Sequence, residues 1–221
     1  MPGEQQSMIR IVKTPSWLRW SAPSLIWKVK DSPLGIYLTF YDGPVPEATP
    51  FVLSLLEKYR AGATFFCVGD NIRKHPEIFR QVVAAGHGIG NHTFNHLNGW
   101  RTGSAGYFKN IRLCDELIRQ HGGSSSPMLF RPPHGKMTIN QYRYLKKNYR
   151  IVMWDVLTWD FSPGDRPDRL FERILISTHA GSIVVFHDSE KTLPGLKIFL
   201  EPFLEYFSSK GYRFLPLENS L

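Results

Sequence analysis

Short apolar runs alternate with longer amphipathic stretches along most of this chain, and the alternation restricts the folds open to it. Such a pattern predicts repeated strand-helix units, whose strands lie parallel in one sheet. The predicted strands are 36–40, 63–68, 88–90, 129–131, 151–154, 182–186 and 213–216. The predicted helices are 49–59, 76–85, 105–121, 138–148, 167–179 and 195–210, the first with an N-cap at Thr49. We therefore expect an α/β fold.

The length and apolar content predict one domain. With 221 residues, of which 42% are hydrophobic, the chain can bury one sizeable core. Residues 36–221 carry the strand-helix pattern. Residues 1–35 are irregular and rich in Trp and Pro, and we expect them to form an arm docked on the domain through Trp17, Trp20 and Trp27.

The net charge bears on the partners of the chain, and the setting of the two cysteines bears on the state of their thiols. The net charge of +8 favours anionic surfaces, but the basic residues are scattered, and the dense group 143–150 fits a solvated helix face with Tyr144 and Leu145 turned inward. Without a nucleic-acid-binding motif, we expect no nucleic-acid partner. Cys67 and Cys114 each lie in an apolar pattern, as buried free thiols do.

No run of residues is apolar for long enough to cross a bilayer, and no export-signal pattern is present. The expected compartment is therefore cytoplasmic by default, with the cell envelope as the alternative. The sequence indicates no oligomeric state.

Polar side chains follow several predicted strands at the point where each strand ends. Parallel strands collect functional residues at their carboxyl ends, because the loops converge there. The residues in such positions are Asp42, His92, Arg131, Asp160 and His187.

Two histidines and one carboxylate form a candidate metal site. His92 and His96 lie four residues apart in 91-NHTFNH-96, so one helical turn would bring both rings to one face. By itself such a pair is more often two structural histidines. With Asp42 from another strand end, the set has the composition of catalytic zinc sites that keep positions open for water and substrate.

Arg131 and His187 have chemical and structural interpretations. The stretch 130-FRPPHG-135 is a rigid turn, but burying the Arg131 guanidinium would require a carboxylate or another acceptor. His187 ends an apolar strand and fits a proton donor, a ligand or a structural histidine. Either Asp155 or Asp160 has the position to orient it, and spacing does not choose between them.

Five motifs, in order, resemble those of the polysaccharide deacetylase family, the NodB-homology domain of carbohydrate esterase family 4. They are 39-TFYDGP-44, 92-HTFNH-96, 131-RPPHG-135, Asp160-Phe161 and 185-VFH-187. The resemblance implies a distorted (β/α)7 barrel. It also implies one divalent metal ion, usually zinc, with cobalt, nickel or manganese as alternatives, held by Asp42, His92 and His96. The implied reaction is hydrolysis of N- or O-acetyl groups on a sugar polymer or oligosaccharide such as peptidoglycan, chitin or xylan.

The resemblance also assigns catalytic roles. His187 would be the general acid, oriented by Asp160, and a backbone N–H near His134 would stabilise the oxyanion. Arg131 would pair with the general base, which in the family is the first Asp of a DD pair. This chain has Tyr41 there, and a phenol of ordinary pKa ~10 is a poor base at neutral pH. Arg131 would be free to lower the pKa of that phenol.

Two functions follow from these residues. The first is a metal-dependent deacetylase with weakened catalysis, because a missing general base typically costs ~10²–10⁴-fold in rate. The second is a non-catalytic metal- and sugar-binding protein on the same fold. Trp100, Trp159 and Phe161 are candidates for stacking on sugar rings, with core packing as the equally plausible alternative.

Overall fold

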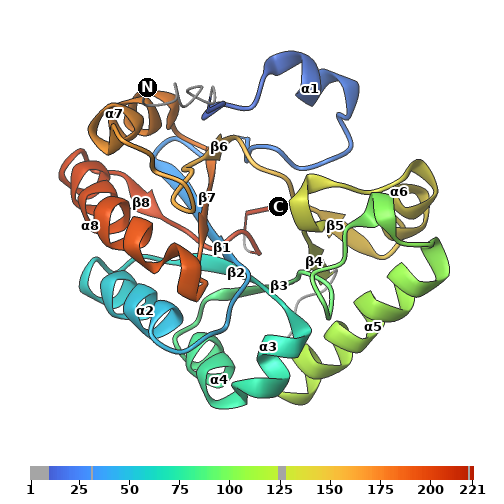
Figure 1. Ribbon diagram of the computed structural model, residues 1–221. Coiled ribbons are helices and arrows are strands. Elements are labelled where there is room, and N and C mark those ends of the chain that lie inside the picture. The colour runs from blue at the N-terminus through green and yellow to red at the C-terminus, as the bar shows by residue number, and fades with distance from the viewer. Residues whose placement is uncertain (1–9, 31, 124–127, 219) are drawn as a thin grey trace, which may run out of the picture.

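The computed structural model describes residues 10–30, 32–123, 128–218 and 220–221. Its centre is an eight-stranded sheet in which every strand pair is parallel. The strand order is β5-β4-β3-β2-β1-β7-β6, with β8 beside β1. The sheet curls into a barrel that stays open between β5 and β6, and helices surround it (Figure 1). This confirms the predicted distorted (β/α)7 barrel.

The strands follow the sequence prediction closely, with one addition. They are β1 (Gly35–Tyr41), β2 (Ala63–Cys67), β3 (Gly88–Asn91), β4 (Met128–Phe130), β5 (Tyr149–Ile151), β6 (Val156–Leu157), β7 (Ile183–His187) and β8 (Arg213–Phe214). Strand β6 was not predicted because two residues cannot show a period. Strand β5 begins and ends earlier than predicted because its first two residues are a tyrosine and an arginine, which hide the strand pattern.

The predicted helices are all present to within a few residues. The helices are α1 (Ser16–Ser21), α2 (Ala48–Lys58), α3 (Gly69–Lys74), α4 (Pro76–Ala84), α5 (Ser104–Gln120), α6 (Ile139–Leu145), α7 (Pro167–Ser177) and α8 (Leu193–Ser209), with 3-10 turns at Gly99–Arg101, Pro133–Gly135 and Glu190–Thr192. The short helices α1 and α3 were not predicted. Thr49 is not an N-cap, because α2 begins at Ala48 and the Thr49 hydroxyl hydrogen-bonds elsewhere. None of the described helices has the length and apolar character needed to span a membrane.

Side chains of β1 alternate between the two faces of the sheet. Ile36, Leu38 and Phe40 belong to the main core under the helices, while Tyr37 and Tyr41 belong to a smaller cluster inside the barrel. The alternation follows from the two-residue period of a strand. Because of this alternation, Tyr41, the last residue of β1, lies inside the barrel. The predicted buried free thiols, Cys67 and Cys114, are confirmed.

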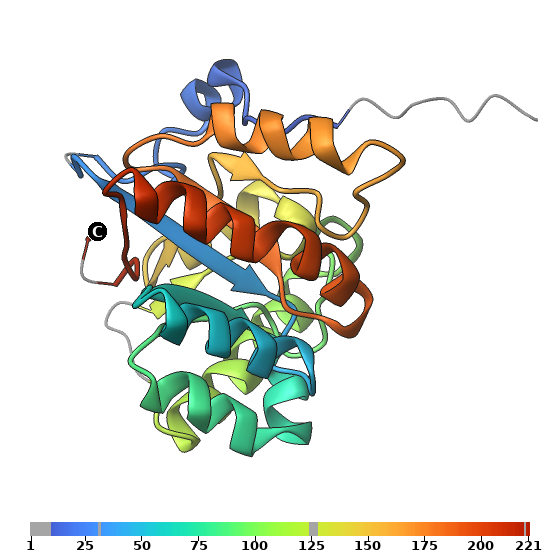
Figure 2. The same cartoon turned by 90° about the vertical axis from the view of Figure 1, so that its left-hand side faces the viewer.

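The N-terminal segment lies across the opening between β5 and β6. The backbone N–H of Leu157 in β6 donates to Val12 O at 2.9 Å. On the other side, Ile26 N–H donates to Ile151 O at 2.9 Å, and Met153 N–H donates to Ile26 O at 2.7 Å. The segment thus supplies hydrogen-bond partners to both ends of the open sheet, and Figure 2 shows it along one side of the barrel.

The three tryptophans of this segment do not behave alike. Trp27 is buried, as predicted, and its Nε1–H donates to Ala22 O at 3.0 Å. Trp17 and Trp20 are 67% and 79% exposed, so the prediction that they pack on the domain is wrong for both. They lie on α1, which has no buried residue. Residues 1–9 and 31 of the predicted arm lie outside the described residues, and its boundary at residue 35 stays a prediction.

Helix α8 offers a direct test of the core. Phe203 is fully buried, with its ring edge against Phe186 at 5.7 Å between ring centroids. We expect Phe203→Ala to lower the free energy of unfolding by ~3–5 kcal/mol, because the side chain cannot be replaced by collapse of its neighbours. Ile198→Ala, on the exposed side of the same helix, should change it by less than ~1 kcal/mol. Urea denaturation measures both, and equal losses would contradict this packing.

Candidate active site

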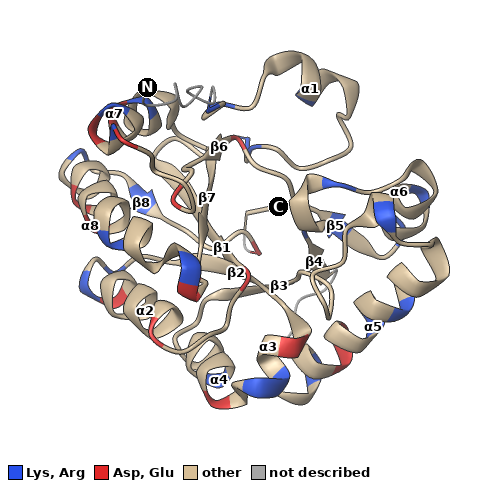
Figure 3. Ribbon diagram, in the orientation of Figure 1, with Lys and Arg blue, Asp and Glu red and all other residues tan. Residues whose placement is uncertain are grey.

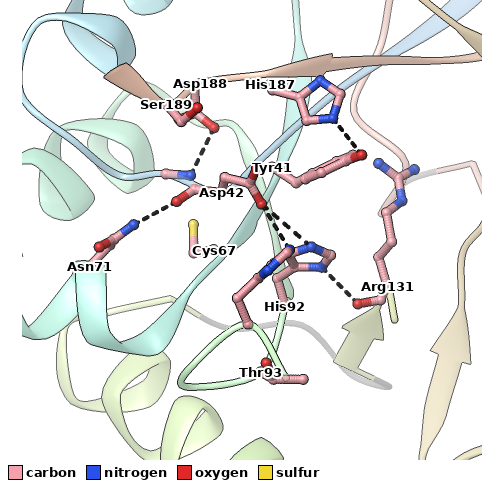
Figure 4. A network of polar contacts seen from close by, with 12 residues as sticks. Tyr41, Asp42, Cys67, Asn71, His92, Thr93, Arg131, His187, Asp188 and Ser189 are labelled. Atoms are coloured by element: carbon pink, nitrogen blue, oxygen red, sulfur yellow. Dashed lines mark hydrogen bonds and ion pairs between the residues drawn. The ribbon is translucent and has the colours of Figure 1, made fainter. Parts of the chain in front are cut away.

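The carboxyl ends of five strands bring all the predicted site residues to one edge of the barrel. Tyr41 ends β1, His187 ends β7, and the others follow β1, β3, β4 and β6 directly or in the next loop. Around them lies a hollow of about 500 Å³, whose lining includes Tyr41, Asp42, His96, His134 and His187. Figure 4 shows how Tyr41, Asp42, His92 and His187 converge. The candidate site therefore lies at the edge of the sheet where the sequence predicted that these residues would meet.

Asp42, His92 and His96 form a cluster with the geometry of a metal site. Oδ1 of Asp42 lies 3.7 Å from Nε2 of His92 and 3.2 Å from Nε2 of His96. The ligand atoms of all three residues lie within 4.8 Å of one another. None of the three atoms, all buried, has a hydrogen-bond partner among the described residues. Buried polar atoms are seldom left without a partner, so this orphaned set fits a divalent cation.

The protein presents both histidines in a form that can ligate. The ring of His92 contacts the Arg131 carbonyl oxygen through Nδ1 at 2.8 Å. Nδ1 must donate this hydrogen bond, which leaves Nε2 with a free lone pair. Burial, followed by the neighbouring His96, holds the pKa of His92 well below its usual value. Burial also lowers the pKa of His96, with Asp42 opposing it.

The predicted helical turn under this pair is absent. Residues 92–96 are irregular, and Thr93 and His96 have positive φ of 66° and 53°. Two asparagines hold the loop instead. Asn91 Oδ1 accepts from Thr93 N–H at 2.7 Å, and Asn110 Oδ1 accepts from Phe94 N–H at 2.8 Å. The sequence analysis assigned no role to either: Asn91 lies directly before His92 at the end of β3, and Asn110 lies on a distant helix and carries no local signal.

Asp42 is held from the other side by two further residues that were missed. Its φ is 82°, and its carbonyl accepts from Asn71 Nδ2 at 2.6 Å. The next N–H, that of Gly43, donates to Asp188 Oδ1 at 3.1 Å. Asp188 also accepts from the Thr49 hydroxyl at 2.7 Å. Burial raises the pKa of Asp188 to about 7. These contacts fix the turn that presents the Asp42 carboxylate.

A chain of hydrogen bonds joins Tyr41, His187 and Asp160. The Tyr41 hydroxyl lies 2.5 Å from His187 Nε2, and Asp160 Oδ1 lies 2.6 Å from His187 Nδ1. Tyr41 and His187 are register partners on neighbouring parallel strands, so their side chains must share a face. Burial alone would lower the pKa of His187, but the charge and hydrogen bond of Asp160 raise it.

The choice left open between two aspartates is now decided. Asp160 contacts His187 through both oxygens, since Oδ2 accepts from the His187 backbone N–H at 2.7 Å. Asp155 faces away from the site. Its carboxylate accepts from Ser182 at 2.6 Å and pairs with Lys13 at 2.6 Å.

Arg131 is fully buried inside the barrel and pairs with no carboxylate among the described residues. Its Nη1 donates to Thr39 Oγ1 at 2.8 Å and its Nη2 to the Met153 carbonyl at 2.8 Å. The guanidinium lies 4.2 Å from the centroid of the Phe66 ring. Burial lowers the pKa of Arg131 to about 9. The acceptors that the sequence analysis required are therefore a hydroxyl, carbonyls and an aromatic face.

Arg131 lowers the pKa of Tyr41, as expected, but other effects outweigh it. Burial, with Asp42 next, raises the pKa of the phenol far above its usual value, and Arg131 offsets this only in part. Desolvation disfavours the charged form of a phenol. Tyr41 is therefore a protonated, neutral group beside the cluster.

The remaining predicted residues lie around the hollow or away from it. His134 is exposed, and its ring edge meets the His96 ring at 4.6 Å between centroids. Phe161 lines the hollow and contacts the His187 ring at 4.8 Å. The Nε1–H of Trp159 donates instead to the Ile11 carbonyl, and Trp100 is 65% exposed outside the hollow.

An open parallel barrel with an Asp-His-His cluster and a His-Asp pair at its carboxyl edge defines the class of carbohydrate deacetylases. The chain belongs to the polysaccharide deacetylase family, which residues 28–152 match. Members of this family hydrolyse carbon-nitrogen bonds of acetylated sugars and are generally metal-dependent. The predicted membership is confirmed.

Relatives include proteins named as peptidoglycan and chitooligosaccharide deacetylases. A peptidoglycan-N-acetylglucosamine deacetylase of Bacillus cereus is 31% identical over 204 residues, or 88% of this chain and 92% of its own. Chitooligosaccharide deacetylases are also among the relatives, and that of Bradyrhizobium sp. is 35% identical over 69% of this chain and 70% of its own.

Solved structures confirm the fold. One peptidoglycan N-acetylglucosamine deacetylase has a TM-score of 0.84 at 29% identity, covering 94% of this chain and 97% of its own. A pseudoenzyme of carbohydrate esterase family 4 from Bacillus anthracis has a TM-score of 0.77 at 22% identity, covering 90% of this chain and 69% of its own. At that identity the likeness concerns the fold alone.

The cluster geometry predicts which histidines control metal content. We expect protein purified without chelator to contain about one divalent ion per chain, and His92→Ala or His96→Ala to lose most of it, because each removes an orphaned ligand atom. His134→Ala is the matched control, since it removes a neighbouring ring that lies outside the cluster. Elemental analysis measures the content. Equal metal in His92→Ala and His134→Ala would contradict the ligand set.

Proposed function

We propose that this protein is a metal-dependent N-deacetylase of an acetylated glycan, such as peptidoglycan or chitin-type oligosaccharides, whose turnover Tyr41 weakens. The observation that carries the proposal is the orphaned Asp42, His92 and His96 cluster facing one hollow with the His187–Asp160 pair. The names of the relatives support the substrate class.

Asp42, His92 and His96 would hold the ion, with zinc as the first choice and cobalt, nickel or manganese as alternatives. The nitrogen and oxygen donor set suits zinc. When bound, such an ion polarises an acetyl carbonyl and lowers the pKa of a water molecule. Asn91, Asn110 and Asp188 keep the donors in place.

His187 would act as the general acid. Its raised pKa favours the protonated form that donates to a leaving amine, and Asp160 fixes its Nδ1 as a donor so that Nε2 faces the hollow. The backbone N–H near His134, at the opposite rim, would stabilise negative charge on the acetyl oxygen. Phe161 would form part of the apolar wall against the acetyl group.

Tyr41 affects this arrangement in two ways. A protonated phenol cannot take a proton from water as a carboxylate does, and its hydroxyl occupies His187 Nε2, the atom that would donate to the leaving group. Loss of a general base typically costs ~10²–10⁴-fold. The same hydrogen bond favours the second candidate function, a non-catalytic metal- and sugar-binding protein. Acetate release from acetylated oligosaccharides at known metal occupancy distinguishes the two.

Replacing Tyr41 tests the weakened-enzyme proposal. We expect Tyr41→Asp to raise deacetylation of a small acetylated chitin oligomer by ~10²-fold or more, because a carboxylate there would face Arg131 and restore a base. Tyr41→Phe removes the hydroxyl from His187 without adding a base, and Tyr41→Ala also clears space. Both should gain much less than Tyr41→Asp. If Tyr41→Asp folds, binds metal fully and gains nothing over the parent, the non-catalytic function is the better one.

His187 should be essential for whatever turnover the parent has. We expect His187→Ala to abolish it while metal content stays unchanged, since His187 lies outside the ligand cluster. Acetate release and elemental analysis on the same sample provide the two readouts. Full activity in His187→Ala would remove the general-acid assignment.

A further inference from the structure

We propose that the outer face formed by α5, α6 and the loops that lead into them binds a glycan bearing carboxylates, which makes an acidic glycan the substrate class. This inference rests on the proposed function, because it takes the bound polymer to be the one that enters the hollow. We call this surface the basic face. It consists of Arg101, Lys109, Arg112, Arg143, Lys146 and Lys147.

The segment that contains the basic face carries the net charge of the whole chain. Residues 97–154 contain ten Lys and Arg against two Asp and Glu. The rest of the chain carries seventeen of each, so it is neutral in sum. The basic residues are scattered along the chain, as the sequence analysis stated, and this segment differs from the rest in its scarcity of acidic residues. In Figure 3, Lys and Arg lie along α5 and around α6, and α5 also carries Asp and Glu.

The six cations of the basic face have no ion-pair partner among the described residues, although some cations on other elements do. All six residues are exposed. Elsewhere, by contrast, Lys58 pairs with Glu201 at 2.5 Å. Asp115 of α5 is buried and accepts hydrogen bonds from Asn91 and Tyr149. It therefore does little to neutralise the surface.

Helices α5 and α6, which carry Lys109, Arg112 and Arg143, pack against each other. Phe108 of α5 stacks on Tyr144 of α6 at 4.0 Å between ring centroids. Like charges within a Debye length of ~8 Å repel one another at physiological salt. An anionic polymer lying across the helices would relieve that repulsion and release counterions.

The basic face begins at the rim of the candidate active site. Each helix of a strand-helix unit starts at the carboxyl edge of the sheet, so α5 and α6 both begin there. The loop before α5 carries His96 and Trp100, and the loop before α6 carries His134 and Lys136. Lys136 Nζ lies 5.0 Å from the Trp100 ring centroid, which joins the two loops. A glycan chain that leaves the hollow on this side would contact these cations directly.

Exposed aromatic rings among the cations favour a glycan over other polyanions. Trp100 is 65% exposed, and Tyr144, predicted to turn inward, is 43% exposed. Aromatic faces stack on the apolar faces of sugar rings, while Lys and Arg pair with carboxylates. A neutral chitin chain would use the rings and leave the cations unpaired. A glycan with carboxylates on its sugars or side chains uses both.

Two polymers with the same sugar backbone test this proposal. The probes are carboxymethyl chitin, which carries carboxylates, and glycol chitin, which carries none. The full chain should bind carboxymethyl chitin at least ~10-fold more tightly at low salt, and the advantage should disappear at high salt. Equal affinity for the two chitins at low salt would overturn the proposal.

Matched charge reversals locate the binding surface. The triple variant Arg112→Glu, Arg143→Glu, Lys146→Glu should lose ~10-fold or more in affinity for carboxymethyl chitin. The control triple Arg169→Glu, Lys197→Glu, Lys210→Glu changes the charge equally on α7 and at α8 and should lose less than ~2-fold. The same basic-face positions changed to Gln should give an intermediate loss. Equal losses in both Glu triples would show a net-charge effect and overturn the assignment.

Two outcomes distinguish this inference from nucleic-acid binding and from the proposed function. If the chain binds duplex DNA more tightly than carboxymethyl chitin through the same residues, the face belongs to nucleic acid and the proposal is wrong. If Tyr41→Asp releases no acetate while the basic-face triple still loses carboxymethyl chitin binding, the proposed function fails and the acidic-glycan surface stands.

Discussion

The two-residue alternation along β1 is the constraint on which the site depends. Outward side chains such as Phe40 tie the strand to the helices, so the strand cannot slide or rotate without emptying the core. The inward row must then end at Tyr41, opposite His187 in the fixed register of β7. The next residue, Asp42, leaves the strand at the height of His92 and His96. Packing on one face of the sheet thus sets the chemistry at its end.

Burial and hydrogen bonding give the neighbouring groups different protonation states. His92 is neutral and open at Nε2, Tyr41 is neutral and protonated, and His187 has a raised pKa because of Asp160. Arg131 remains a buried cation supported by carbonyls and a hydroxyl. The barrel interior around it tolerates a tyrosine where the family has an acid, because Thr39 and Met153 already satisfy the guanidinium. We therefore expect Tyr41 to affect the proposed reaction more than the architecture.

Much of the fold and most of the candidate site could be predicted from the sequence. Strand-helix alternation is a local pattern, and His92, Arg131 and His187 each follow an apolar strand, so the edge on which they meet follows from topology. The residues that were missed act over long distances in the chain. Asn110 supports a loop sixteen residues before it, and Asp188 reaches Thr49 across 139 positions. The exposure of Trp17 and Trp20 was also missed, because composition does not say what a helix packs against.

The N-terminal segment has a consequence for how the barrel is completed. Lys13 bonds to Asp155, the residue before β6, across 142 positions, and the segment also supplies backbone partners beside β5. Contacts of such separation carry a large loop-closure entropy and form after local strand-helix units. Until the segment docks, both edges of the sheet expose unpaired N–H and C=O groups, which are templates for pairing with another chain. By covering both edges of the open sheet, the N-terminal segment protects them from pairing with another chain.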